Sequence, residues 1–248
     1  MKFEENYPYP DISLIERFSG VKASIQSIHN QGFASAVFME MTIFEKAWRI
    51  RGMENLLVDM MIRPEVAECL LENIASRMAS LAKAYAQCGV DIIMLGDDVG
   101  AETSMILSPS LWRKMIKPQL SNVIDSARAG NSKVLIFYHS DGKIEPIIPD
   151  LIEIGVDILN PIQPESIDID WLKNEYGADL SFWGGIGVQT TMPFGSPEDV
   201  HKSVQSLIRR AGSGGGLLVA PSHVIEHDVP WQNIRAFIDA MNQYGSYR

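Results

Sequence analysis

Short apolar runs alternate along the chain with longer segments in which apolar and polar positions follow a helical period. Six of these runs predict β-strands, at about 33–39, 91–96, 133–138, 157–160, 180–184 and 216–220. They are continuously apolar, as expected of parallel strands that are covered on both faces. The clearest predicted helices are 64–88, 109–129 and 197–211, and each opens with a proline in its first turn. This regular alternation of strand and helix indicates a parallel α/β sheet.

A short phrase marks the points where helix passes into strand. Gly-Val-Asp-Ile stands at 89–92 and again at 155–158, and Gly-Ala-Asp-Leu at 177–180 is a third version. Each copy follows a helical pattern and precedes an apolar run. A glycine just past a helix supplies the left-handed residue that ends it, so the phrase predicts three helix-to-strand joints.

Two folds contain strands and helices in this order, the (βα)8 barrel and the open doubly wound sheet. No GxGxxG or GxxxxGK[ST] motif follows an early strand, so the usual phosphate loops of open sheets are missing. Polar residues follow almost every predicted strand, at the face where barrel enzymes keep their active sites. We therefore predict a single domain over residues 1–248 with an incomplete (βα)8 TIM-type barrel of six βα units. Its open strand edges predict a homo-oligomer, or a partner chain that completes the barrel.

Composition narrows the class of protein. The 248 residues are 46% apolar, enough to bury a large core, and the formal charge of −10 disfavours a nucleic-acid or anionic-membrane surface. The N-terminus, MKFEENYPYPD, lacks the basic start and apolar run of a signal peptide. Cys69 and Cys88 have no CxxC spacing and suggest neither a disulfide framework nor a cysteine metal site. We expect a soluble, cytoplasmic protein.

Candidate chemistry gathers where the predicted strands end. His139 and Asp141 follow one strand and His223 follows another, so all three are expected at the same face of the barrel. They supply nitrogen and oxygen ligands suited to zinc or another divalent metal, with a position left open for substrate. Alternatively, His139 serves as a general acid–base group, or it is a plain hydrogen-bonded loop residue without a chemical role.

Asp97 and Asp98 end the strand DIIMLG and are catalytic candidates, since one could accept a proton or orient a substrate. Adjacent buried carboxylates raise each other's pKa, so only one of the pair is expected to face the site. Glu40 is either a third acidic group there or the start of a helix. The remaining predicted substrate-binding residues at strand ends are Asn160, Gln163, Trp183, Gly184, Gly185 and Ser222.

The turn Gly184–Gly187 has two interpretations. Glycines let a ligand approach the backbone, and free amides in such a turn can hold an anion. A tight loop without a ligand is the other interpretation.

Several of these segments together resemble a known family. HSDG, PDLIEIGVDILNPIQ, LSFWGGIGVQTTMPFGSPEDV and GLLVAPSHVIEHDVPWQNIRAFIDA are similar to the C-terminal two thirds of the uroporphyrinogen decarboxylase superfamily. YAQCGVDIIMLGDDVGAETSMILSPSLWRKMIKPQL resembles its central part. The resemblance implies a (βα)8 barrel, and full-length members that extend further at the N-terminus.

The resemblance implies one of two activities. One is cofactor-free decarboxylation of uroporphyrinogen III in porphyrin biosynthesis, by enzymes with an arginine-rich N-terminal segment and an aspartate that are not present here. No arginine stands at the six predicted strand ends, although an octacarboxylate needs cationic partners. The other activity is zinc-dependent methyl transfer between corrinoid proteins and small thiols or methoxylated compounds.

The thiol methyltransferases of the family bind zinc through a His-x-Cys pair and a later Cys. Here His139 keeps the histidine, Asp141 takes the place of the first cysteine, and His223 falls at or next to the second. A cysteine-free site is harder and better matched to an oxygen-bearing substrate such as a methyl ether. The sequence thus favours a corrinoid-dependent, metal-assisted methyltransferase with the corrinoid on a separate protein. Its rivals are a true decarboxylase and a non-catalytic, truncated barrel acting as an accessory subunit.

Overall fold

The computed structural model describes residues 18–39 and 41–246, and Glu40 therefore lies outside the described residues. Six strands among them form one sheet in the order β1-β2-β3-β4-β5-β6. Their bounds are β1 Ala36–Met39, β2 Ile92–Gly96, β3 Leu135–His139, β4 Ile158–Asn160, β5 Ser181–Ile186 and β6 Leu217–Pro221. Each predicted strand is present, and the predicted α/β class is confirmed.

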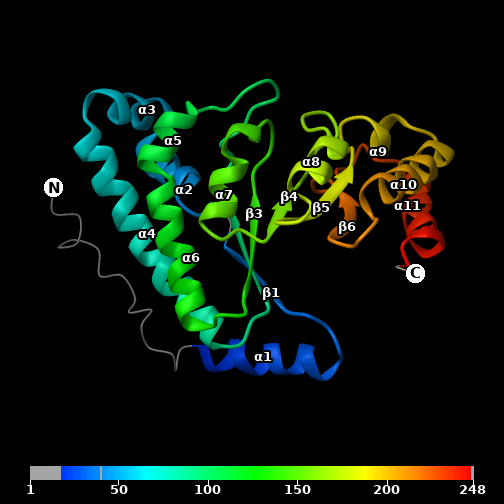
Figure 1. The fold of residues 1–248 in the computed structure, drawn as a ribbon, viewed down its shortest axis with the longest axis horizontal. Coiled ribbons are helices and arrows are strands. Elements are labelled where there is room, and N and C mark those ends of the chain that lie inside the picture. The colour runs from blue at the N-terminus through cyan, green and yellow to red at the C-terminus, as the bar shows by residue number, and fades with distance from the viewer. Residues whose placement is uncertain (1–17, 40, 247–248) are drawn as a thin grey trace. The chain divides into compact units, whose positions relative to one another are not determined.

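Helices separate the strands along the chain, as Figure 1 shows. The first group is α1 Ser19–Asn30, α2 Phe44–Arg51, α3 Met53–Ile62, α4 Pro64–Gln87, α5 Pro109–Met115 and α6 Lys117–Gly130. The second group is α7 Ile148–Glu153, α8 Ile169–Tyr176, α9 Thr191–Phe194, α10 Pro197–Ala211 and α11 Trp231–Tyr244, with a 3-10 turn at Glu145–Ile147. None of the described helices is both long and apolar enough to cross a membrane.

The chain divides into two compact units, which are described separately. The first consists of Met1–Met94 and Pro118–Leu135, and the second of Leu95–Lys117 and Ile136–Arg248. In the first unit, α4 packs against α2 and α3. Gly130 of α6 lies against α4, where an added Cβ would be 2.6 Å from the Lys83 carbonyl oxygen.

The second unit holds most of the strand ends that concern function. Within it β3 pairs with β4, β4 with β5 and β5 with β6, all in parallel. Helix α10 packs against α8, α11 and the strands β5 and β6. Its start is fixed by a capping box in which Ser196 and Asp199 satisfy each other's backbone amides, as the Ser-Pro signal predicts.

One predicted helix is divided in the structure. The segment 109–129 forms two helices, α5 and α6, with the break at Ile116. Pro118 lies two residues after this break, in the first turn of α6. A proline lacks the amide hydrogen that a continuous helix needs, and it clashes with the carbonyl four residues earlier. The prediction of a single helix was therefore wrong.

The repeated phrase has the predicted geometry at two of its three copies. Gly89 and Gly155 have φ values of 89° and 95°, in the left-handed region that ends a helix. Gly177 has a φ of −67°, so the third copy does not end its helix in this way. There the chain continues into a further turn, closed by the Leu180 amide, which donates to the Tyr176 carbonyl at 2.8 Å.

The aspartates of the first two copies have a role that the sequence pattern did not reveal. Asp91 accepts a hydrogen bond from the Ser35 amide at 2.7 Å, just before β1. Asp157 accepts one from the Ile136 amide of β3 at 2.6 Å. Each carboxylate thereby binds a backbone donor where a neighbouring strand begins.

Asp91 is also held by His29 of α1, whose Nε2 lies 2.7 Å from Asp91 Oδ2. Partial burial opposes the charge of this carboxyl, but the hydrogen bonds from Ser35 and His29 outweigh that effect and keep its pKa below the usual value. Charged hydrogen bonds of this kind stabilise the folded state only while the carboxyl is ionised.

We expect Asp91→Asn to lower the free energy of unfolding at pH 7 by about 1 kcal/mol, a modest value because the carboxyl is partly exposed. The lowered pKa means that the wild-type contribution is complete above the unfolded pKa of about 4 and is lost as pH falls through the folded pKa. The difference between the two proteins should therefore shrink in acid. Urea unfolding at neutral and acidic pH measures it, with Asp179→Asn from the third copy as a control that should change little. An equal loss in both variants would contradict the anchoring role.

Candidate metal centre

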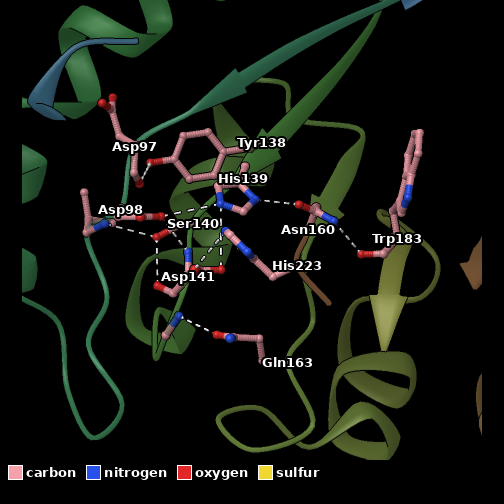
Figure 2. A network of polar contacts seen from close by, with 12 residues as sticks. Asp97, Asp98, Tyr138, His139, Ser140, Asp141, Asn160, Gln163, Trp183 and His223 are labelled. Atoms are coloured by element: carbon pink, nitrogen blue, oxygen red, sulfur yellow. Dashed lines mark hydrogen bonds and ion pairs between the residues drawn. The ribbon is translucent and has the colours of Figure 1, made fainter. Parts of the chain in front are cut away.

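Three side chains of the second unit come together at the carboxyl ends of β3 and β6. His139 is the last residue of β3, Asp141 lies two residues later, and His223 lies two residues after β6. One ligand atom from each lies within 4.8 Å of the others. Figure 2 shows both imidazole rings directed at the Asp141 carboxyl group.

The distances between these atoms suit a small metal ion. His139 Nε2 is 3.7 Å from Asp141 Oδ1, and His223 Nε2 is 3.8 Å from Asp141 Oδ2. Ligands at about 2.1 Å from a tetrahedral zinc lie about 3.4 Å from one another. The two nitrogen–oxygen distances exceed this spacing by a few tenths of an ångström, and the whole set lies within 4.8 Å, so the side chains would have to draw closer around a bound ion.

Ser140 and Gly142, the other two residues of HSDG, explain how the loop places His139 and Asp141 close together. Ser140 is buried, and its hydroxyl accepts from the Val99 amide at 3.1 Å and donates to the Asp141 carbonyl at 3.2 Å. Gly142 has a φ of 76°, and an added Cβ there would lie 2.6 Å from the Ala101 carbonyl oxygen. Position 142 thus requires glycine for two reasons: its backbone is in the left-handed region, and the β2–α5 segment lies too close for a side chain.

Only one of the two adjacent aspartates faces this group. Asp98 Oδ1 accepts from the Asp141 amide at 2.9 Å and lies 3.6 Å from His139 Nε2. The side chain of Asp97 is fully buried, and in Figure 2 its carboxyl group points away from the cluster. The structure therefore brings Asp98 to the site, whereas the carboxyl group of the other catalytic candidate, Asp97, lies elsewhere.

The environment of Asp141 is unfavourable for a lone carboxylate. Burial raises its pKa above the usual value, the nearby charge of Asp98 adds to this effect, and His139 and His223 counteract it. Its Oδ1 atom is buried and has no hydrogen-bond partner among the described residues. Such an atom costs free energy unless something binds it. A divalent cation between the two histidines would supply that partner, so the donor set fits the predicted metal.

Two predicted substrate-binding side chains are engaged with the protein. Asn160, the last residue of β4, has its Oδ1 2.6 Å from His139 Nδ1, and its Nδ2 donates to the Trp183 carbonyl at 2.9 Å. Gln163 accepts from the Gly142 amide through Oε1 at 2.8 Å. The ring of Trp183 packs edge-on against Phe137, with centroids 5.3 Å apart. These residues support the loop that carries the cluster.

The predicted turn at Gly184–Gly187 was wrong in its first part, because β5 continues through Ile186. Gly184 and Gly185 pair with Val219 and Ala220 of β6. The Gly185 amide donates to the Pro161 carbonyl at 3.2 Å, and an added Cβ at Gly184 would overlap that oxygen. Gly184 therefore admits the backbone of the β4–α8 loop, and Gly185 leaves room for the Leu207 side chain of α10. Because the Gly185 amide is already hydrogen-bonded, it is not one of the free amides predicted to hold an anion.

Ser222 lies between β6 and His223. Its amide donates to the Ile186 carbonyl at 2.8 Å, and its buried hydroxyl has no hydrogen-bond partner among the described residues. It keeps the position beside the cluster that the sequence predicts, and its substrate-binding role stays a prediction.

A cavity of about 490 Å³ was not predicted from the sequence. It lies between the segment 162–169, β5 and α10, and its charged lining residues are Glu165, Asp168 and Arg210. Arg210 forms ion pairs with Asp170 at 2.7 Å and Asp168 at 3.4 Å. Because the lining comes from separate segments, no local pattern could have revealed it.

The fold and the cluster define an α/β protein whose polar groups gather at the carboxyl ends of parallel strands. The sequence profile described as uroporphyrinogen decarboxylase (URO-D) matches residues 14–244, so the chain belongs to this family. The predicted superfamily is confirmed.

Relatives of the chain include proteins named as methyltransferases and proteins named as decarboxylases. A methylated-thiol–coenzyme M methyltransferase of Methanosarcina mazei is 22% identical over 200 residues, which are 81% of this chain and 51% of that protein. A uroporphyrinogen decarboxylase of Pseudoalteromonas atlantica is 24% identical over 189 residues, 74% of this chain and 50% of that protein. The chain thus spans about half the length of these curated relatives.

Structural similarity supports the fold. A solved methyltransferase from Methanosarcina mazei superimposes with a TM-score of 0.75 at 18% identity, over 98% of this chain and 69% of that one. At this level of identity the likeness concerns the fold, and it agrees with the predicted incomplete barrel.

We expect Asp141→Asn to raise the stability of the metal-free protein by about 1 kcal/mol, or about 2–4 °C in Tm, because it removes a charge from a desolvating site. Thermal unfolding at pH 7 with a chelator present measures the change. Asp98→Asn is the matched control, since this more exposed neighbour should have a smaller effect. Excess zinc should stabilise the wild type more than Asp141→Asn, so that the wild type then has the higher Tm. A metal-free Asp141→Asn less stable than the wild type would show that the charge of Asp141 does not destabilise the folded state.

Proposed function

We propose that this chain is a metal-assisted methyltransferase that depends on a corrinoid carried by a separate protein. The observation that carries the proposal is the convergence of His139, Asp141 and His223 within 4.8 Å. The similarity to a methyltransferase of the same family supports it.

The donor set favours an oxygen-bearing methyl compound. Two imidazoles and a carboxylate form a harder ligand set than one containing thiolates. A divalent metal bound there would supply Lewis-acid polarisation of the leaving oxygen. The side chain of His223 is 43% exposed, so a small substrate would reach the cluster from the side of this residue. We therefore propose a small methyl ether as the substrate, with a methylated thiol, as in the name of the relative, as the competing class.

The chain's own groups would bind the substrate and manage its proton. Asp98 Oδ1 lies 3.6 Å from His139 Nε2, close enough to orient a substrate hydroxyl or hold a proton for the departing oxygen. In the proposed reaction the oxygen would leave the methyl carbon with both bonding electrons and take up a proton, and a reduced, nucleophilic corrinoid on the separate protein would accept the methyl group. The reverse direction uses the same groups.

Decarboxylation of a porphyrinogen is the second candidate, favoured by the relatives that have this activity. It requires no metal. Asp98 and Asp141 would place two carboxyl groups beside a substrate that is itself rich in carboxylates, and like charges at short range repel. An accessory role without catalysis is the third candidate, and it predicts neither methylcobalamin formation nor carbon dioxide release in the methyl-transfer test below.

The metal content of the purified chain tests the site. We expect about one zinc or similar divalent ion per chain in the wild type and in His227→Ala, since two histidines and a carboxylate are enough protein ligands for an open zinc site. His139→Ala and His223→Ala should lose most of the metal. Inductively coupled plasma mass spectrometry after purification without chelator gives the answer. His227 lies in an exposed loop near His223, which makes it a matched control. Equal metal in all four proteins would refute the site, and metal in none would leave the two rival functions.

Methyl transfer is tested with reduced cobalamin as the acceptor. The zinc-loaded protein is mixed with a methyl ether or a methyl thioether, and methylcobalamin formation is followed by absorbance. The ether should react faster, and His139→Ala should lose the activity. Carbon dioxide release from a porphyrinogen, without methylcobalamin formation, would instead establish the decarboxylase.

We further propose that another copy or a partner chain pairs with the open sheet. The terminal strands of the described sheet are β1 and β6, and Leu218 on β6 is 50% exposed. Exposed apolar strand edges associate readily. Sedimentation of the purified protein should give a mass above the 27.6 kDa of one chain. A stable monomer at high concentration would favour a heterologous partner over self-association.

A further inference from the structure

His139 is held by the protein through the ring nitrogen that does not face the cluster. Its Nδ1 lies 2.6 Å from Asn160 Oδ1, whereas its Nε2 faces Asp98 and Asp141 at 3.6 and 3.7 Å. The two nitrogens therefore have different tasks, and Nδ1 is the one bound at hydrogen-bond distance in the structure, as Figure 2 shows.

The direction of the hydrogen bonds follows from what each atom can do. The Trp183 carbonyl can only accept, so the Asn160 atom facing it at 2.9 Å must be the amide nitrogen. The amide oxygen of Asn160 is then the atom that faces His139, and it too can only accept. His139 must therefore carry a proton on Nδ1, and the neutral ring has its lone pair on Nε2.

The strands fix the hydrogen-bonded chain of His139, Asn160 and the Trp183 carbonyl. His139 and Asn160 are register partners in the parallel pair β3–β4, and the Ser140 amide donates to the Asn160 carbonyl at 3.1 Å. Trp183 is fixed in turn by its pairing with Leu218 of β6. The backbone of Asn160 is thus fixed by β3 on one side, and its side-chain amide is held by the Trp183 carbonyl of β5 on the other.

We propose that Asn160 is a positioning residue that fixes the tautomer and the ring orientation of His139, so that Nε2 is presented as a metal ligand. This inference rests on the proposed metal site. Partners of this type, which bind the remote nitrogen of a ligating histidine, raise metal affinity by fixing the ring before the metal arrives. The assignment replaces the predicted substrate-binding role of Asn160, because its oxygen and its nitrogen both have protein partners.

The tautomer is measured in the metal-free protein, by long-range proton–nitrogen NMR of the histidine rings at a pH where His139 is neutral. We expect protonated Nδ1 and unprotonated Nε2 in the wild type. Asn160→Leu has a similar volume and removes the acceptor, so His139 should shift toward the Nε2-protonated tautomer. Gln163→Leu is the matched control: it removes a buried amide of the same loop that binds Gly142 and does not contact His139.

Asn160→Asp separates positioning from stability. Its carboxylate can still accept from His139 Nδ1 but cannot donate to the Trp183 carbonyl, so it should lower stability and keep the tautomer. This variant also serves if Asn160→Leu fails to fold. An unchanged tautomer in Asn160→Leu, or a changed one in Asn160→Asp, would overturn the inference.

Zinc titration then connects the tautomer to the metal. We expect Asn160→Leu to bind zinc about 10–100-fold more weakly than the wild type, the range seen for partners of ligating histidines. Asn160→Asp should bind within a few-fold of the wild type. Absence of zinc binding by a wild type that shows the expected tautomer would refute the proposed metal site and leave the positioning of His139 standing.

Discussion

The parallel pairing of β3 with β4 is the constraint on which the site depends. It sets His139 opposite Asn160 and so places the imidazole, its amide partner and the loop that follows within a few ångströms of one another. In a parallel sheet every strand delivers its last residue to the same edge. Side chains distant in sequence, such as His139 and His223, meet because their strands end at that edge.

The position of Asp141 lowers the stability of the metal-free fold but suits the proposed metal site. Asp141 is drawn into a partly buried position by the tight turn at Gly142, and one of its oxygens lacks a hydrogen-bond partner within the described residues. Unsatisfied buried polar atoms are rare in folded proteins and often mark functional sites. The neighbouring polar residues Ser140, Asn160 and Gln163, by contrast, have well-formed hydrogen bonds. Asp141 thus differs from these three neighbours in having an oxygen that faces the proposed metal without a hydrogen-bond partner.

The family relationship gives this contrast a chemical meaning. Relatives named as a methyltransferase and as a decarboxylase are about equally distant from the chain, so overall similarity does not decide the reaction. The choice of reaction therefore rests on the proposed ligands His139, Asp141 and His223 at the strand ends. If they hold a metal, this His-Asp-His set would favour harder substrates than a set with cysteines would.

The sequence by itself determined the α/β class, all six strands, the proline-opened helices and the set of residues at the strand ends. These features are local: apolar runs, proline and glycine positions and capping residues act over a few neighbouring residues. The helix break before Pro118 is also a local effect, whereas the continuation of β5 through Gly184 and Gly185 depends on their pairing with β6. Only the tertiary structure decided that Asp98 and not Asp97 faces the cluster, and that Asn160 supports His139. Those outcomes depend on which backbone atoms of other strands lie opposite each side chain, and that information is absent from any short stretch of sequence.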